Sequence, residues 1–334
     1  MKAIVIREFG SPDVLKLEEV PTPQPGPGEV LIEVKAVSVN RTLDLVVRKG
    51  RYAVTPPLPH ILGVDPVGVI AEVGPGVENR RVGQRVTTSL RISPPDAPPQ
   101  LLGVHVWGGY AQYVKVPADK THLIPDTLGF TEACVIARHA PTAFHLLRDR
   151  ASLKAGEWVL VMGAAGGLGS SGVQAAKVLN AKVIAAAGAD ERVNAAIQLG
   201  ADAGINYREQ DLVSEVMRIT GGKGVDIVFE NVGDPEMFPK AFASLGKFGR
   251  LITAGSHGGG GVHLDISRLY LNQLTIIGAV GETPKDIAFA LGAAAEGKIK
   301  ALVDRVLPLK DAALAHELVE KRSGLGKIVL DPTL

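Results

Sequence analysis

Short apolar runs alternate with helical periodicities through the second half of the chain. Residues 158–162 form a β-branched, apolar run typical of a buried parallel strand, and residues 170–180 follow at helical spacing. Further strands are predicted at 182–187, 203–206, 225–229, 249–254 and 274–280. Further helices are expected at about 190–199, 209–220, 235–245 and 265–272. This alternation predicts an α/β fold built on a parallel, doubly wound sheet.

The first part of the chain has a different pattern, with many short strands and turns. The predicted strands are 2–7, 14–20, 30–37, 63–74, 82–88 and 108–116. This density of strands predicts a small barrel-like domain. A short helix is expected at 40–49, where Asp44 and Arg48 have the i, i+4 spacing of an ion pair. The proline-rich segment 93–103 reads as a surface loop.

Two helices and a strand are expected outside these two blocks. Residues 131–147 have a helical pattern, and 308–321 and 326–331 read as a last helix and a last strand. Cys134 lies in the first of these helices within an apolar run, where a buried core cysteine is expected.

A glycine cluster follows the strand at 158–162. Gly163, Gly166, Gly167 and Gly169 lie between that strand and the next helix. A turn without side chains lets a pyrophosphate approach the backbone and sit at the positive end of the helix. Ala164 interrupts the strict G-x-G-x-x-G spacing, so a plain strand-to-helix turn is an alternative interpretation.

The end of the next strand bears on the choice of cofactor. NAD-binding units usually carry Asp or Glu there, which binds the adenosine ribose hydroxyls. Here the strand ends in Ala187 and Gly188, and Arg192 follows at the start of a helix. The small residues leave room for a 2′-phosphate that Arg192 can neutralise, which favours NADPH. The alternative is that Arg192 is an ordinary solvated charge.

Length and composition narrow the class of protein. The 334 residues suffice for about two domains, and 46% hydrophobic and 21% charged residues are typical of a globular protein. A net charge of +1, without a run of Lys or Arg, argues against nucleic-acid or membrane-surface binding. No apolar stretch reaches the ~18 residues needed to cross a bilayer, and the first ten residues look like a strand rather than a signal peptide. A cytoplasmic enzyme is expected.

Several segments together resemble the medium-chain dehydrogenase/reductase superfamily, and its quinone oxidoreductase (zeta-crystallin-like) branch in particular. The matching segments are KAIVIREFGSPDVL, VSVNRTLDLVVRKGRY, GVDPVGVIAEVGPGV, GGYAQYVKVPA, VLVMGAAGGLG, GADAGINYRE, GVDIVFENVG and GKIVL. The resemblance implies a β-rich, GroES-like catalytic domain at 1–125 and 282–334. It implies a Rossmann dinucleotide-binding domain at 126–281.

The sequence differs from the zinc-dependent alcohol dehydrogenases of that superfamily. Where they supply Cys, His and Cys to a catalytic zinc ion, this chain has Asn40, Val64 and Arg138. Val and Arg are not zinc ligands. The single Cys134 also excludes any multi-cysteine zinc site. No bound metal is therefore expected.

The resemblance implies roles for individual residues. Asn40 and Tyr52 are the candidate catalytic residues: Asn40 to position the nicotinamide ribose or a water, and Tyr52 to hold the cofactor or polarise a carbonyl. A helix cap and a packed turn tyrosine are the structural alternatives. Trp107, near the same cleft, has no firm match in the family. The implied cofactor-binding residues are Ala165, Gly166, Gly167, Leu168, Gly188, Arg192, Tyr207, Asn231, Thr253, Ala254, Gly255, Ser256 and Arg322.

These observations predict an NADPH-dependent oxidoreductase that transfers hydride to a quinone or an α,β-unsaturated carbonyl without zinc. Such acceptors need little metal help, because the β-carbon takes the hydride while charge moves onto oxygen. A reductase of enoyl or acryloyl thioesters and a non-catalytic NADPH-binding protein are the alternatives. A homodimer is expected, because the apolar strand at 274–280 should lie at a sheet edge that a second copy can extend.

Overall fold

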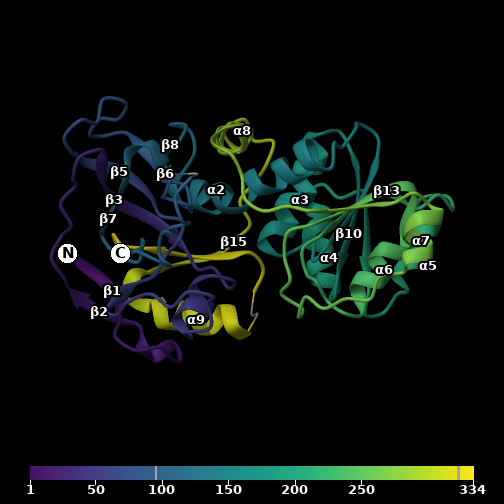
Figure 1. Ribbon diagram of the computed structural model, residues 1–334, viewed down its shortest axis with the longest axis horizontal. Coiled ribbons are helices and arrows are strands. Elements are labelled where there is room, and N and C mark those ends of the chain that lie inside the picture. The colour runs from purple at the N-terminus through teal and green to yellow at the C-terminus, as the bar shows by residue number, and fades with distance from the viewer. Residues whose placement is uncertain (95, 322–323) are drawn as a thin grey trace. The chain divides into compact units, whose positions relative to one another are not determined.

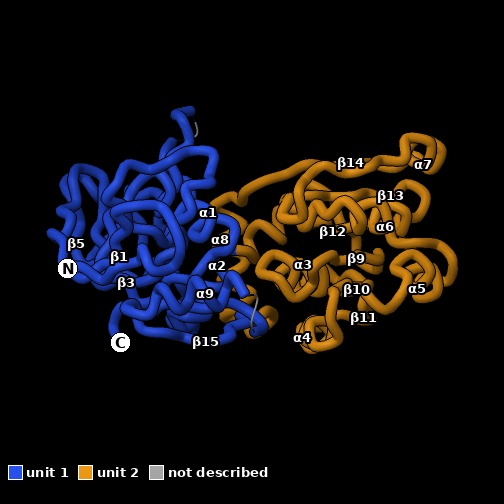
Figure 2. Tube along the Cα trace, turned by 90° about the horizontal axis from the view of Figure 1, so that it is seen from below, with its two compact units in different colours: residues 1–138, 301–334 blue, residues 139–300 orange. Residues whose placement is uncertain are grey.

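The computed structural model describes residues 1–94, 96–321 and 324–334 (Figure 1). The chain forms two compact units, residues 1–138 with 301–334 (unit 1) and residues 139–300 (unit 2), which Figure 2 colours separately. The chain passes from one unit to the other after residues 138 and 300, whereas the sequence suggested domain boundaries after 125 and 281. The first half of α2 (Phe130–Phe144) belongs to unit 1, and α8 (Pro284–Ala295) belongs to unit 2.

Unit 2 is a parallel α/β sheet. Its six strands lie in the order β11-β10-β9-β12-β13-β14, and every pairing is parallel. The strands are β9 (Trp158–Met162), β10 (Lys182–Ala187), β11 (Ala203–Asn206), β12 (Val225–Glu230), β13 (Leu245–Thr253) and β14 (Thr275–Gly278). The helices that connect them are α3 (Gly167–Val178), α4 (Asp190–Gln198), α5 (Leu212–Ile219), α6 (Met237–Ala243) and α7 (Ile266–Leu271). The predicted doubly wound sheet is confirmed.

The order of the strands reverses beside β9, so the loops after β9 and β12 leave the sheet at its carboxyl edge and diverge. The central strands are apolar on both faces because helices cover both: Val159, Leu160 and Val161 are fully buried. This edge is the place where open α/β sheets bind ligands.

Unit 1 is rich in β structure. Its larger sheet has the order β15-β16-β3-β5-β6-β8, with β7 also paired to β3, and a smaller sheet has the order β2-β1-β4. The strands are β1 (Lys2–Ile6), β2 (Lys16–Glu19), β3 (Glu29–Ser38), β4 (His60–Ile61), β5 (Val67–Val73), β6 (Arg85–Thr88), β7 (Tyr113–Pro117), β8 (Thr121–Leu123), β15 (Val303–Pro308) and β16 (Lys327–Asp331). The antiparallel pairing of β16 with β3 brings the two ends of the chain into one sheet. This confirms the β-rich domain.

Two short helices of unit 1 complete its core, α1 (Asp44–Arg48) and α9 (Ala312–Lys321). The expected ion pair between Asp44 and Arg48 is wrong. Asp44 accepts backbone hydrogen bonds, and Arg48 pairs with Glu320 of α9 at 2.5 Å. Arg48 is fully buried, and its guanidinium therefore turns toward a carboxylate on a neighbouring helix.

Candidate functional site

The turn between β9 and α3 is built for close backbone approach. Gly163 has a φ of +62°, and a Cβ on Gly169 would lie 2.1 Å from the carbonyl oxygen of Gly163. Glycine adopts such a φ without strain, and the close contact at position 169 leaves no room for a side chain. Gly166 is the N-cap of α3 and offers no capping side chain, which leaves the first amides of the helix available for an anion.

The predicted pyrophosphate-binding residues all lie at this turn. Ala165 and Gly166 precede α3, and Gly167 and Leu168 are its first two residues. A Cβ at Gly167 would lie 2.6 Å from Nε2 of His139, so the backbone there is held against an imidazole. The turn fits the diphosphate of a dinucleotide.

A second group of predicted residues meets at the end of β10. A Cβ on Gly188 would lie 3.1 Å from the hydroxyl of Tyr207 and 3.2 Å from Nε of Arg208. Arg192 lies in the first turn of α4. Arg322 lies outside the described residues. The sequence prediction missed Arg208, although it directly follows Tyr207 in the chain.

Asp190, the acidic residue near Gly188 and Arg192, forms a hydrogen bond with a neutral side chain. Asp190 precedes Arg192 on α4, and its Oδ1 accepts a hydrogen bond from Nδ2 of Asn206 at 2.8 Å. Asn206 is the last residue of β11. The carboxylate is therefore engaged at the strand end, which limits how far it can cancel the positive charge of Arg192.

The remaining predicted cofactor residues lie together at the ends of β12 and β13. Asn231 donates to the carbonyl of Met162 at 2.6 Å, and Thr253 donates to Glu230 at 3.3 Å. A Cβ on Gly255 would lie 2.5 Å from the carbonyl oxygen of Asn231, so this run packs directly against the loop after β12. The members of the run are Thr253, Ala254, Gly255 and Ser256.

Glu230 is a buried carboxylate that the sequence prediction did not single out. It accepts hydrogen bonds from the amides of Val232 and Gly233 at 2.9 and 3.0 Å. Burial raises the pKa of Glu230, while those amides oppose the rise. Its hydrogen bonds hold the loop that follows β12 and carries Asn231.

Unit 1 contains a buried polar cluster around Asn40. The side chain of Asn40 is 2% exposed, and both ends of its amide are occupied. Its Oδ1 accepts from Nζ of Lys327 at 2.6 Å, and its Nδ2 donates to Oδ2 of Asp65 at 2.9 Å. The alternative role of Asn40 as a helix cap is not seen, because the N-cap of α1 is Leu43 and the side-chain amide of Asn40 faces β16 and the loop after β4.

Two carboxylates surround Asn40. Asp65 accepts from the amide and the hydroxyl of Ser38 at 2.9 and 2.5 Å. Asp44 accepts from the amides of Asn40 and Gly63 at 2.7 and 3.0 Å. Burial, followed by the repulsion of Asp65, raises the pKa of Asp44 to about 7. This value puts a change of charge near neutral pH inside the cluster.

A chain of hydrogen bonds in unit 1 joins His316 of α9 to Arg48 and Tyr110. His316 is fully buried, with Nδ1 3.3 Å from Nη1 of Arg48 and Nε2 3.1 Å from the hydroxyl of Tyr110. Burial, then the charge of Arg48, lowers the pKa of His316 to about 3. Since Arg48 only donates, Nδ1 of the neutral ring is the acceptor and Nε2 carries the hydrogen toward Tyr110.

Tyr52 and Trp107 have less distinctive surroundings. Tyr52 is partly buried and packs against the hydrophobic core of unit 1. Trp107 is 38% exposed and donates from its indole to the carbonyl of Pro59 at 3.2 Å. The described contacts anchor Trp107 in its loop and leave the role of Tyr52 as a prediction.

The residues at the presumed zinc-ligand positions do not fit a zinc ion. Val64 is 1% exposed within the core, Asn40 has its amide oxygen engaged by an ammonium group, and Arg138 is a cation. The buried thiol of Cys134 donates to the carbonyl of Asp65 at 3.4 Å, and burial raises its pKa well above the ordinary value. A zinc site needs unprotonated donors that converge on one point, and this set lacks them.

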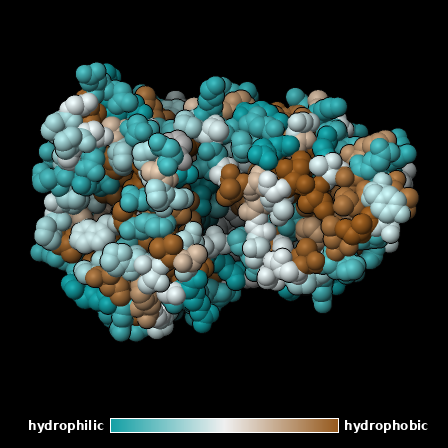
Figure 3. All heavy atoms as spheres, in the orientation of Figure 1, coloured by the Kyte–Doolittle hydropathy of each residue, from teal (hydrophilic) through white to brown (hydrophobic). Residues whose placement is uncertain are grey.

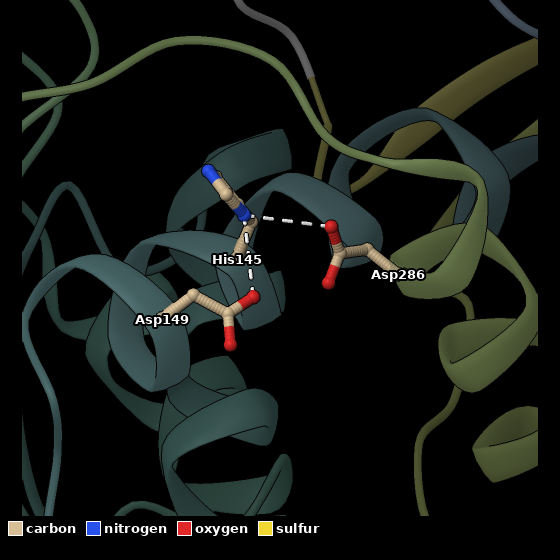
Figure 4. Close-up of side chains that lie close together, drawn as sticks. All are labelled: His145, Asp149 and Asp286. Carbon is tan, nitrogen blue, oxygen red and sulfur yellow. Dashed lines mark hydrogen bonds and ion pairs between the residues drawn. The ribbon is translucent and has the colours of Figure 1, made fainter.

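Within the described ranges, one group of His and Asp side chains converges closely enough for a metal, at His145, Asp149 and Asp286 (Figure 4). Arg148 already bridges its carboxylates, at 2.8 Å to Asp149 and 2.5 Å to Asp286. Asp286 also accepts from the amide and hydroxyl of Thr283 at the start of α8. The lone pairs that a metal would use are therefore engaged by protein donors.

Comparison with known proteins agrees with this architecture. Residues 26–126 match the alcohol dehydrogenase GroES-like domain, and residues 167–296 match the zinc-binding dehydrogenase family. The chain is 33% identical to the human quinone oxidoreductase over 99% of this chain and 97% of that protein. It is 35% identical to an alcohol dehydrogenase of Geobacillus stearothermophilus, over 99% of each chain.

Solved structures give the same result. The crystal structure of an NAD-dependent alcohol dehydrogenase superposes with a TM-score of 0.93 at 36% identity, and the match covers 99% of each chain. That fold implies a nicotinamide cofactor, for which the turn before α3 provides the expected cradle. This chain is therefore an oxidoreductase of the medium-chain dehydrogenase/reductase superfamily and belongs to its quinone oxidoreductase-like branch.

Proposed function

We propose that this protein reduces quinones and α,β-unsaturated carbonyls with NADPH and without zinc. The observation that carries the proposal is the make-up of the buried cluster in unit 1. It offers an amide, an ammonium group, a guanidinium and two hydrogen-bonded carboxylates. Among the described residues, the group of His and Asp side chains that converges closely enough for a metal lies in unit 2, outside this cluster. Reduction of a conjugated acceptor needs orientation and hydrogen-bond donors, which such a cluster can supply.

Alcohol oxidation is the activity that relatives named alcohol dehydrogenase would suggest. It requires stabilisation of an alkoxide, for which those enzymes usually employ a metal ion. Where zinc ligands would be needed, this chain has Val64 in its apolar core and the cation Arg138. The donor set therefore favours acceptors whose charge is spread by conjugation.

The preference for NADPH rests on the end of β10. Gly188 faces Tyr207 and Arg208, and no carboxylate follows the strand directly. Bound NADPH would supply the hydride. Tyr207, Arg192 and Arg208 would hold the adenosine phosphate, and the amides at the start of α3 would hold the diphosphate.

The experiment uses pure protein, NADPH or NADH, and a panel of quinones, enones, enoyl thioesters and simple alcohols. We expect oxidation of NADPH with quinones or enones, at a rate that a chelator leaves unchanged. Turnover confined to enoyl thioesters would point to a thioester reductase. Binding of NADPH without any turnover would point to a non-catalytic binding protein.

We also propose that two copies associate through β14. This strand ends the six-stranded sheet, and exposed apolar side chains lie on it and on α7. Figure 3 shows apolar residues gathered on this face of unit 2. Among the exposed apolar side chains of these elements, Ile276 lies on β14, Val280 follows it, and Leu271, Tyr270 and Ile266 lie on α7. An open edge with an apolar surface beside it favours strand pairing with a second copy.

A further inference from the structure

Lys327 is a cation on β16 whose bonds to the described residues leave part of its hydrogen-bonding capacity unused. Its Nζ donates to Oδ1 of Asn40 at 2.6 Å and to the carbonyl of Val39 at 3.1 Å. An ammonium group has three hydrogens, so these bonds leave one donor for a further acceptor. Burial, and then the charge of Arg138, lowers the pKa of Lys327, while the nearby carboxylate of Asp65 opposes the change.

Arg138 provides a second cation beside the same cluster. It lies four residues after Cys134 on α2, and the thiol of Cys134 contacts the backbone of Asp65. Residues four apart share one face of a helix, so Arg138 lies on the face that packs toward Asp65. Its Nε is buried and has no hydrogen-bond partner among the described residues. Such a donor costs stability unless a ligand satisfies it.

The charges of the cluster favour an anion. Lys327 and Arg138 carry two positive charges, and Asp65 carries one negative charge with its oxygens held by Ser38 and Asn40. Asp44 has a pKa of about 7, so at neutral pH its carboxyl group is protonated and uncharged in a substantial fraction of the protein molecules. The cluster then has surplus positive charge and two unused N–H donors.

We propose that Lys327 and Arg138 form an oxyanion-binding site that stabilises the negative charge developing on the carbonyl oxygen of the substrate. This inference rests on the proposed reduction of quinones and enones. Asn40 is then a positioning residue, because its amide oxygen holds Nζ of Lys327 in place.

The chemistry at this site is a conjugate addition. The β-carbon of the enone accepts the hydride, the carbon–carbon π pair shifts to form an enolate, and the carbonyl oxygen takes up negative charge. The N–H groups of Lys327 and Arg138 hold that oxygen, and a proton from solvent then adds at the α-carbon. The substrate gains one hydride and one proton, and the cofactor is oxidised by two electrons. Donors aimed at the developing charge act mainly on the rate of hydride transfer.

The kinetic test measures single-turnover hydride transfer from NADPH to an enone in three variants. Lys327→Met should slow this step on the order of 100-fold, and Arg138→Gln about tenfold, with the Kd of NADPH changed less than about threefold. Lys16→Met, which removes an exposed lysine of the same unit, is the matched control and should leave the rate unchanged. If Lys327→Met fails to fold, Arg138→Gln decides, because Nε of Arg138 holds no described contact.

A second readout does not depend on turnover. 4-Nitrophenol absorbs strongly in the visible only as the phenolate, so an oxyanion site should increase that absorbance at constant pH. We expect an increase with wild type and Lys16→Met and none with Lys327→Met. No phenolate uptake by wild type, or equal uptake by Lys327→Met, would overturn the assignment. Weaker NADPH binding with unchanged hydride transfer would overturn it too, in favour of a contact with the cofactor's phosphates. Failure of every acceptor with wild type would refute the proposed reaction, and the phenolate measurement would still test the site.

Discussion

Asp44 is a buried carboxylate of unit 1 that titrates near neutral pH. It is fully buried and accepts two backbone amides, yet burial and the repulsion of Asp65 raise its pKa from an ordinary 3.8 to about 7. The folded protein therefore binds a proton at Asp44 between about pH 4 and 7, whereas the unfolded chain is ionised there. Since the folded state holds the extra proton, this contribution to stability is lost as pH rises through that window.

Replacing Asp44 by Asn should remove this loss. From pH 5 to pH 8 the wild type should lose about 2.6 kcal/mol of unfolding free energy through Asp44, and Asp44→Asn should not. Chemical denaturation at both pH values measures the difference. Asp119→Asn is the control, because Asp119 is 66% exposed and its removal should leave the pH dependence unchanged. The same fall in Asp44→Asn as in wild type would assign the titration to another group.

The arginines beside Gly188 determine the second prediction. A charge-assisted contact to a phosphate is worth about 1.5–3 kcal/mol, so one effective arginine gives roughly a ten- to hundredfold preference for NADPH over NADH. We expect Arg192→Ala to remove most of this preference and to leave NADH binding unchanged. Arg208→Ala should reduce what remains. Fluorescence titration with both cofactors measures the ratio. Equal affinities in the wild type would refute NADPH selectivity.

In each of these groups of contacting residues, some members were singled out from the sequence, and the charged residues that contact them were missed. Asn40, Gly188 and Tyr207 were found because each follows a strand or matches a family motif. Lys327 and Arg208 carry the charges beside them; both lie in segments that match the family, GKIVL and GADAGINYRE, but the match assigned neither side chain a role. Lys327 meets Asn40 only because β16 pairs with β3 across nearly the whole length of the chain.

The contact between α8 and the π-helical turn His145–Arg150 is held by charge. Asp286 caps α8 together with Thr283, is fully buried, and accepts from Arg148 at 2.5 Å. The ring of Phe289 lies 4.9 Å from that of Phe144 at an angle of 83°, and the guanidinium of Arg148 lies over Phe289 at 5.3 Å. One carboxylate thus serves both as a helix cap and as the partner of an arginine.

Asp286→Asn should therefore destabilise the protein by about 2 kcal/mol, because the amide cannot accept every bond that the carboxylate accepts and leaves Arg148 partly unpaired. Asp149→Asn changes the 39%-exposed partner of the same arginine and should cost less than about 0.5 kcal/mol. Thermal unfolding of both variants provides the comparison. Equal losses of stability in the two variants would mean that burial of Asp286 does not strengthen its contribution.

The elements that the sequence missed have weak patterns. α8 has the sequence PKDIAFALGAAA, in which small residues blur the difference between its faces, and it was not predicted. β15 has the sequence VDRVLP, which lacks clean alternation; no strand is predicted at 303–307, and Pro308 falls in the helix expected at 308–321. The parallel strands of unit 2 were predicted because their apolar runs are continuous and turns separate them.

The oligomeric state follows from the exposed end of the sheet in unit 2. We expect the protein in solution to have twice the 35.0 kDa mass of one chain. Val280→Asp introduces a charge at a side chain that is 90% exposed in the single chain, and should shift the mass toward one copy. Val82→Asp, at a 58%-exposed valine of unit 1, is the control and should leave the mass unchanged. A monomeric wild type at micromolar concentration would refute the association through β14.

The proposed function assigns the reduced nicotinamide to unit 2 and the hydrogen-bond donors for the substrate to unit 1, without a metal. Each assignment rests on a replaced residue. Gly188 follows β10 where NAD-binding units usually carry an acidic residue, and Val64 and Arg138 of unit 1 stand where zinc-dependent enzymes have metal ligands.

The most direct test follows the hydride itself. Chelator-treated protein, shown by elemental analysis to be free of zinc, is mixed with NADPH deuterated at the nicotinamide C4 and with an enone, and the product is analysed by mass spectrometry and NMR. We expect one deuterium at the β-carbon of the saturated ketone, at the same rate as in untreated protein. Transfer that appears only after zinc is restored, or deuterium at the carbonyl carbon of an alcohol product, would contradict this expectation.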